Sequence, residues 1–460
     1  MILLRRHGRP RLAAALGGLL LAGAVLALPA SASASWSTAF VSSAQLGLAV
    51  ETPATAVDAD GDSFFAWRRT DNVILGRTRS AAGRFGPLLT LSKEGPGLPG
   101  VLMPAVAANS RGDALFAWLT TNAAKTNYLV QGRFRTANGT LGPIQNLASE
   151  PVIEGEVVEV DVALDADGDA VVMYQQESLN DGAQVLARQR SAAGTMGATK
   201  RISAGGVDSE VFDPELEMDG GGEAVFVWQQ DSPLVEGKIQ ARVMSPTGTL
   251  GTPKTLVNAD SSLSATEGEG EFTQLAVNPR GDAAFTWTRK IIATSKYVIE
   301  GRVLTDDDVL RRTVRVSASD TLVTESEVDI ANSGAAVFGW GQKDLATGKF
   351  RYMGRQLSAT NALGASKTLT GGASDVPHGH VAVDAAGNAH FVWPDLAAVT
   401  GIPLVRYRAM TAAGALRPPT TIVEREIGVD GSDLVVSAQG NAVPSWINSD
   451  VNRLQAAFGP

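Results

Sequence analysis

The chain has 460 residues, and its 39 lysines and arginines against 48 aspartates and glutamates give a net charge of −9. It has no cysteine, which excludes disulfides, thiolate metal ligands and cysteine nucleophiles. Because phosphate binding needs clustered basic residues, the acidic balance disfavours nucleic acid as a partner. We therefore expect a chain that is stabilised by packing alone and binds no nucleic acid.

Residues 1–34 predict an export signal that is absent from the mature protein. Four arginines precede an apolar run from Leu12 to Leu28, and small residues suited to a signal peptidase end the segment at Ala34. No later stretch reaches the roughly 18 apolar residues that a membrane span needs. We expect a secreted, extracellular protein with no transmembrane segment in the mature chain. The export route, general or twin-arginine, stays open.

A repeat organises the rest of the chain, and Val162–Tyr174 shows it most clearly: VALDADGDAVVMY, two apolar runs around a tight turn. Eight turn glycines, spaced 51 to 59 residues apart, mark the copies: Gly61, Gly112, Gly168, Gly222, Gly281, Gly334, Gly387 and Gly440. An aromatic residue stands six positions after each: Trp67, Trp118, Tyr174, Trp228, Trp287, Trp340, Trp393 and Trp446. Spending seven of eight tryptophans on one position is typical of a repeat architecture.

Each unit predicts four short antiparallel strands, which we call a, b, c and d in chain order. Strand a precedes the glycine and strand b follows it, the two joined by a hairpin turn rich in Gly, Asp and Asn. On one face of strand b the fourth unit places Ala224, Phe226 and Trp228, a period of two. The other face carries Val225 and Val227, so both faces should be buried between stacked sheets.

Strand c carries an arginine in seven units, at Arg77, Arg133, Arg188, Arg242, Arg302, Arg355 and Arg408. Since a residue present in seven units cannot mark one unique pocket, we expect it to tie the unit to a neighbour or to a backbone carbonyl. A second tight turn, for example SPTGTLGT, then leads into strand d.

The two ends of the mature chain complete each other. The eighth unit stops after its strand c at 454–458, while residues 36–42 form a strand d with no unit before it. Over the whole mature chain this pattern resembles the β-propeller superfamily. The resemblance implies an all-β, eight-bladed propeller in a single domain, residues 35–460, closed by the N-terminal strand. The motifs of WD, kelch, sialidase and quinoprotein propellers are missing, so no named family follows. We expect a monomer.

Several motifs are better explained by the repeat than by a ligand. Arg111-Gly112-Asp113, which spells the integrin tripeptide, occupies the same turn as Asp58–Asp62, which looks like the start of a calcium loop. A calcium loop needs a further carboxylate where apolar strand b begins instead. We predict hairpin turns at both places and a packed core histidine at His390.

The two faces of such a ring differ in sequence. The a-to-b and c-to-d turns share one face, which we call the turn face, and they are short and nearly uniform. The b-to-c and d-to-a connections share the opposite face, the loop face, and they vary in length and chemistry, with an acidic run at Glu267–Glu271. Because binding sites are built from loops on a rigid scaffold, we expect function on the loop face.

Acids gather seven and nine positions before the turn glycines, where strand a begins beside the central channel. This ring of positions, the channel mouth, holds Glu159, Asp161, Asp213, Glu215, Glu325, Glu327 and Asp433. Glu217 and Asp329 lie one step deeper, where five units carry Ala. Three interpretations stay open: a solvated acidic edge, a binding rim, or a catalytic rim of acid and base pairs.

The seventh unit places two histidines in the same ring, His378 and His380. Two residues apart on a strand, they would project the same way, about 6–7 Å apart. With Glu325, Glu327 or Asp433 they could hold a divalent cation such as zinc. The alternative is that they titrate near neutral pH and bind nothing.

No motif of a nucleophile with its activating base is present, and we assign no catalytic residue. The sequence therefore favours a secreted or surface-associated binding or scaffold protein that holds a glycan, a peptide or a protein partner. The alternative is an extracellular polysaccharide hydrolase or lyase in which two rim carboxylates act as acid and base.

Overall fold

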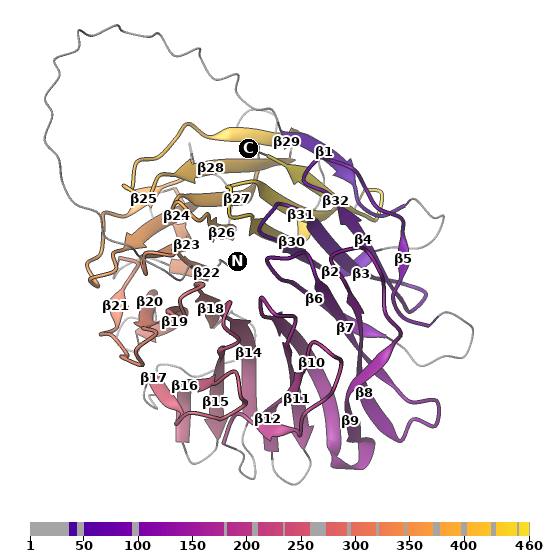
Figure 1. Ribbon diagram of the computed structural model, residues 1–460. Coiled ribbons are helices and arrows are strands. Elements are labelled where there is room, and N and C mark those ends of the chain that lie inside the picture. The colour runs from indigo at the N-terminus through magenta and orange to yellow at the C-terminus, as the bar shows by residue number, and fades with distance from the viewer. Residues whose placement is uncertain are drawn as a thin grey trace, which may run out of the picture.

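In the computed structural model, eight four-stranded antiparallel sheets stand radially around a central channel (Figure 1). The eight-bladed propeller predicted from the repeat is confirmed. The structure describes residues 36–43, 50–93, 101–178, 182–204, 210–232, 235–257, 273–291, 296–318, 322–344, 347–370, 378–396, 403–424, 429–448 and 450–459. The predicted export signal lies outside these residues, and so does the acidic run at 267–271. No helix in the described chain is long and apolar enough to cross a membrane.

Strands a and b form the inner half of each blade. The innermost strands are β2 (Val50–Val57), β6 (Leu102–Ala108), β10 (Gly155–Leu164), β14 (Glu210–Met218), β18 (Gln274–Val277), β22 (Leu322–Ile330), β26 (His380–Val383) and β30 (Val429–Val436). The b strands are β3 (Ser63–Arg69), β7 (Ala114–Thr121), β11 (Ala170–Ser178), β15 (Ala224–Ser232), β19 (Ala283–Ile291), β23 (Ala336–Lys343), β27 (Ala389–Leu396) and β31 (Ala442–Asn448).

Strands c and d form the outer half. The c strands are β4 (Val73–Arg79), β8 (Asn127–Arg135), β12 (Gly182–Arg190), β16 (Val235–Met244), β20 (Lys296–Leu304), β24 (Phe350–Leu357), β28 (Pro403–Met410) and β32 (Arg453–Phe458). The d strands are β5 (Leu89–Thr90), β9 (Gln145–Pro151), β13 (Lys200–Arg201), β17 (Lys254–Val257), β21 (Val314–Arg315), β25 (Lys367–Thr368), β29 (Thr420–Glu424) and, in the last blade, β1 (Ser37–Phe40). One short 3-10 helix, η1 (Val152–Glu154), precedes β10.

The N-terminal strand closes the ring, as predicted. β1 pairs antiparallel with β32, Ser37 opposite Phe458, and the N–H of Val41 donates to the carbonyl of Leu454 at 2.9 Å. In Figure 1 the first and last strands of the chain lie side by side in one blade. The outer edge that strand c would otherwise expose is thus covered.

The core lies between the blades. All eight aromatics placed six residues after the turn glycines are at most 1 % exposed. Trp228 and Phe226 of the fourth blade pack with Met173 and Ile202 of the third, so strand b buries its wide face against the preceding sheet. The two-sided burial predicted for strand b is confirmed, and it leaves the channel and the loops to carry function.

The repeated arginine of strand c is an inter-blade tie, as predicted. In the fourth blade Arg242 donates through Nε to the carbonyl of Gly251 in its own c-to-d turn and through Nη1 to that of Ile202 in the preceding blade. The other six arginines make the same two kinds of contact. These arginines are therefore structural.

The turn motifs are also structural. Asp58 Oδ1 accepts hydrogen bonds from the N–H groups of Asp60, Gly61 and Asp62, at 2.8 to 3.0 Å, and so closes its own turn. Asn109 does the same in the turn that contains Arg111. The hairpin interpretation of both motifs is confirmed. His390 is buried, 2.9 Å from the hydroxyl oxygen of Tyr407 and 3.4 Å from a carboxylate oxygen of Asp384, and is a core histidine.

Candidate functional site: the channel and its mouth

A β-bulge interrupts the innermost strand at the channel mouth in six blades. In the fourth blade the pairing passes from Phe212 to Glu215, so Asp213 falls in the bulge, where its φ is +46°. Thr52 and Met103 occupy the same place in their blades, also with positive φ. The alternation of side-chain direction predicted along strand a therefore does not continue through this point, because a bulge adds residues to one strand only.

The residues seven positions before the glycines stay in the ladder, and three of their acids tie neighbouring blades. The innermost strand is the inner edge of its sheet, so some of its N–H groups have no strand partner. A carboxylate of the preceding blade accepts a hydrogen bond from such a group. The pairs are Asp161 with Leu216 N–H at 3.2 Å, Glu215 with Leu275 N–H at 2.6 Å, and Asp433 with Thr55 N–H.

None of the three interpretations of the rim, as a solvated edge, a binding rim or a catalytic rim, included this structural use of its acids. The signal was available, because Leu216, Leu275 and Thr55 all stand six positions before a turn glycine. Asp329 makes a similar contact one step deeper and accepts from the N–H of Val383 at 2.6 Å. Four acids of the channel are thus engaged with backbone donors.

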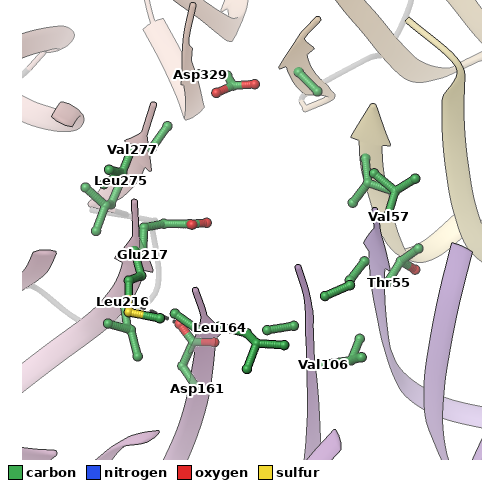
Figure 2. A pocket seen from close by; sticks show the side chains of 18 of the residues that line it. Thr55, Val57, Val106, Asp161, Leu164, Leu216, Glu217, Leu275, Val277 and Asp329 are labelled. Carbon is green, nitrogen blue, oxygen red and sulfur yellow. Dashed lines mark hydrogen bonds between the residues drawn. The ribbon is translucent and has the colours of Figure 1, made fainter. Parts of the chain in front are cut away.

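The channel contains a cavity of about 310 Å³. It is lined mainly by aliphatic side chains of the innermost strands, and three carboxylates reach it: Asp161, Glu217 and Asp329. In Figure 2 the Glu217 side chain extends into the open space, whereas Asp161 lies beside Leu216 of the next strand. Glu217 is therefore the acid that the channel presents to its interior.

The surrounding protein raises the pKa of these channel acids. Burial raises the pKa of Asp161 and of Asp329 to about 6, against the lowering effect of the backbone N–H groups that they accept. Glu217 is exposed to the channel, but protein encloses the channel, and this desolvation raises its pKa to about 7. The like charges of Asp161 and Asp329 act in the same direction.

At the mouth, the structure brings Glu159 close to two other predicted acids. Burial raises the pKa of Glu159 to about 7, and the charges of Asp213 and Asp161 add to the effect. Burial also raises the pKa of Asp213. A carboxyl group that titrates near neutral pH beside a second carboxylate can donate or accept a proton, or can accept hydrogen bonds from a ligand.

The second group of predicted residues surrounds His380. Its Nδ1 lies 3.3 Å from a carboxylate oxygen of Glu327. Burial alone would lower the pKa of His380, but the charge and hydrogen bond of Glu327, with the charges of Asp433 and Glu325, raise it. The partly buried His378 lies just before this strand. Within the described residues no group of three or more His, Asp or Glu side chains has a geometry that would hold a metal ion, and zinc binding stays a prediction.

Two acid pairs on the loop face were not predicted. Glu156 stands directly opposite Glu177 in the third blade, and Glu210 stands opposite Asp231 in the fourth. Both pairs occupy the positions twelve before and nine after the turn glycine, so the repeat register could have revealed them. Like charges at opposed positions of an antiparallel pair are destabilising, which distinguishes Glu156 and Glu177 from the acids that accept backbone N–H groups.

No family model matches the sequence, and no curated protein matches it. Among solved structures, the BP39L lectin from Burkholderia pseudomallei is similar over 81% of this chain and 99% of its own, with 10% identity and a TM-score of 0.50. A polysaccharide lyase described as an ulvan lyase is similar over 90% of this chain and 94% of its own, with 8% identity and a TM-score of 0.49. The propeller domain of the Trilobed protease from Pyrococcus furiosus covers 83% and 99%, with 7% identity and a TM-score of 0.43. At such identities the likeness shows the fold alone.

Proposed function

We propose that the protein is a non-catalytic binding or scaffold protein, exported from the cell, that holds a partner on its loop face and at its channel mouth. The observation that carries this proposal is the division among its acids. Asp161, Glu215, Asp329 and Asp433 accept backbone N–H groups of the next blade, so they position blades. The acids left to meet a ligand are Glu217 in the cavity, the other acids of the mouth, and acids on the loop face.

The surface chemistry favours a peptide or protein partner over a glycan. A neutral sugar ring is commonly held by stacking its C–H groups on an exposed aromatic ring, since such a ring is flat and apolar. Among the described residues, every strongly exposed large apolar side chain is aliphatic. An acidic glycan would in addition be repelled by the acids of the mouth. The lectin among the similar structures keeps a glycan in the range of ligands to be tested.

The proposal is tested by screening the purified protein on peptide and glycan arrays and assaying the polysaccharides for cleavage. Binding without cleavage supports it. The informative variant is Glu159→Gln with Asp213→Asn at the mouth, and the matched control is Asp60→Asn with Asp167→Asn on the turn face. Binding that the mouth variant and the control retain equally, or binding to neither array, would overturn the proposal.

One observation favours the alternative of a polysaccharide hydrolase or lyase. Glu159, with a pKa of about 7, stands beside Asp213, whose pKa burial also raises, and two neighbouring carboxyls can serve as acid and base. In that case Glu159→Gln should abolish release of reducing ends or unsaturated products. Asp161→Asn should retain it, because an amide oxygen can still accept the N–H of Leu216.

A further inference from the structure

We propose that the loop face of blades two to four binds a cationic peptide segment of a partner protein, in which lysines or arginines alternate with aliphatic side chains. This inference rests on the proposed binding function and specifies its partner. The surface consists of three aliphatic residues, Leu102, Met103 and Ile153, beside six acids that we call the acidic sector: Glu154, Glu156, Glu159, Glu177, Glu210 and Asp213.

The aliphatic side chains form the apolar part of this surface. Ile153, on η1, is 82% exposed, and Leu102 and Met103, at the start of β6, are 45% and 43% exposed. β6 packs beside β10, which η1 immediately precedes, so the three residues border the same pair of blades. Exposed aliphatic residues gathered on a loop face commonly mark an interaction site.

The negative charge of the acidic sector determines that the partner's charge should be positive. Glu154, Glu156, Glu177 and Glu210 are exposed. Across the described loop-face ends of the a, b and c strands, Lys238 is the only base in blades three and four, and blade two adds the exposed Lys125 between β7 and β8. Burial raises the pKa of Tyr128 on strand c of blade two, and the charge of Glu156 adds to this effect, so the field of Glu156 reaches blade two. A positively charged segment would be attracted to this surface from solution.

Blades five and six show the contrast within the same face. Three of their bases have partners in their own blades: Lys290 lies over Tyr297, Lys343 lies over Phe350, and Arg351 pairs with Asp344. In blade three, by contrast, acid stands opposite acid, Glu156 opposite Glu177. A cationic side chain placed between two such carboxylates would relieve their repulsion, and the apolar residues would bury its aliphatic neighbours.

The test measures binding of labelled synthetic peptides to the purified protein by fluorescence anisotropy. The probe is a twelve-residue peptide of alternating Lys and Leu, compared with a Lys/Ser peptide and a Glu/Leu peptide. We expect the Lys/Leu peptide to bind most tightly, the Lys/Ser peptide more weakly, and the Glu/Leu peptide not at all. Binding should weaken as salt rises from about 0.05 to about 0.5 M, because screening shortens the reach of surface charges.

Two variants of equal charge change locate the site. Glu156→Lys with Glu210→Lys should weaken Lys/Leu binding by about tenfold or more. Asp60→Lys with Asp167→Lys, on the turn face, should change it by less than about twofold. Ile153→Ser should weaken binding of the Lys/Leu peptide and leave that of the Lys/Ser peptide unchanged. Equal losses in the two charge variants, or equal affinity for all three peptides, would overturn the inference.

The array screen separates failure of this inference from failure of the proposed function. If a neutral glycan or an acidic peptide binds and the mouth variant abolishes that binding, the protein is a binding protein with a different partner. If no array ligand responds to substitutions on the loop face, both proposals fail. Circular dichroism and melting of each variant show that any loss of binding is not a loss of fold.

Discussion

Acidic side chains have opposite roles at the turn face and at the loop face of the ring. At the turn face, Asp58 and Asp165 each direct a carboxylate oxygen to N–H groups of their own turn. At the loop face, Glu156 and Glu177 oppose each other across a strand pair. The turns leave backbone donors that a carboxylate of the same turn satisfies, whereas Glu156 and Glu177 face each other instead of such donors. A carboxylate is thus structural where backbone donors are unpaired, and is available to a partner elsewhere.

The channel lies between these two ends and shows both uses. Asp161 and Asp329 accept N–H groups of the next blade, while Glu217 extends into the cavity (Figure 2). Burial raises the pKa of all three, so their charges are costly to maintain. The channel therefore contains acids that hold neighbouring blades together, Asp161 and Asp329, and one acid, Glu217, that faces the cavity.

The largest effect should come from the turn face. Asp58→Ala leaves the N–H groups of Asp60 and Asp62 without their acceptor, while the N–H of Gly61 keeps the backbone carbonyl of residue 58. The free energy of unfolding should fall by about 2–3 kcal/mol. Urea denaturation measures it. Asp58→Asn should retain most of the stability, because Asn109 and Asn278 perform this role in other blades. Equal losses in the two variants would show that the hydrogen bonds are not the cause.

The pH dependence of stability should follow the raised pKa values. Native Glu159 and Asp161 hold protons up to about pH 7 and 6, while in the unfolded chain they release them near their usual values. The native state therefore binds more protons in this window. Stability should rise by about 1–2 kcal/mol as pH falls from 8 to 5.

Below about pH 4 the trend should reverse. The hydrogen bond from Arg69 holds the pKa of Asp71 below its usual value. Burial would raise the pKa of Asp384, but its hydrogen bonds with His390 and Asn388 hold that pKa below the usual value. Their stabilisation is lost on acidification. A melting-temperature series should have its maximum near pH 5, and Glu159→Gln should flatten its neutral side. A steady rise in melting temperature up to pH 8 would contradict the enclosed state of these acids.

A smaller loss is expected for the inter-blade ties. Asp161→Ala leaves the N–H of Leu216 unpaired but also removes a buried charge, so the net cost should be about 1 kcal/mol. Asp161→Asn should restore most of it. Glu217→Gln, in the same cavity, should leave stability unchanged or raise it. If Glu217→Gln destabilised as much as Asp161→Ala, the distinction between the two acids would fail.

The smallest effect should be a gain. Glu177→Lys replaces a like-charge pair with an opposite one and should add up to about 1 kcal/mol to the free energy of unfolding. The same variant should weaken binding of the Lys/Leu peptide. Glu177→Lys should therefore be more stable than the original protein and bind the peptide less tightly. A destabilised variant would indicate that Glu177 has a structural partner.

Most of the architecture could be predicted from sequence because its causes are local. The spacing from each turn glycine to the buried aromatic, Gly222 to Trp228 for example, fixes where strand b starts and which face is wide. The strand-c arginines were predictable for the same reason, since Arg242 reaches a carbonyl only nine residues away in its own turn. Even ring closure followed from counting strands at the two ends.

The roles of the acids depended on contacts between blades. The repeat register places the backbone partners, such as Leu216, but it does not show that an acid of the preceding blade reaches them. Asp161 and Glu217 look alike in sequence, yet Asp161 meets a backbone donor 55 residues away and Glu217 meets the open channel. The bulge at Asp213 lies in the pairing of β14 with β15 of its own blade, and it ends the alternation on which the predicted rim depended. The sequence by itself determined the ring, because turns and alternating burial act within one blade. Only the tertiary structure decided which carboxylates are satisfied, because that depends on which backbone groups the neighbouring blade leaves unpaired.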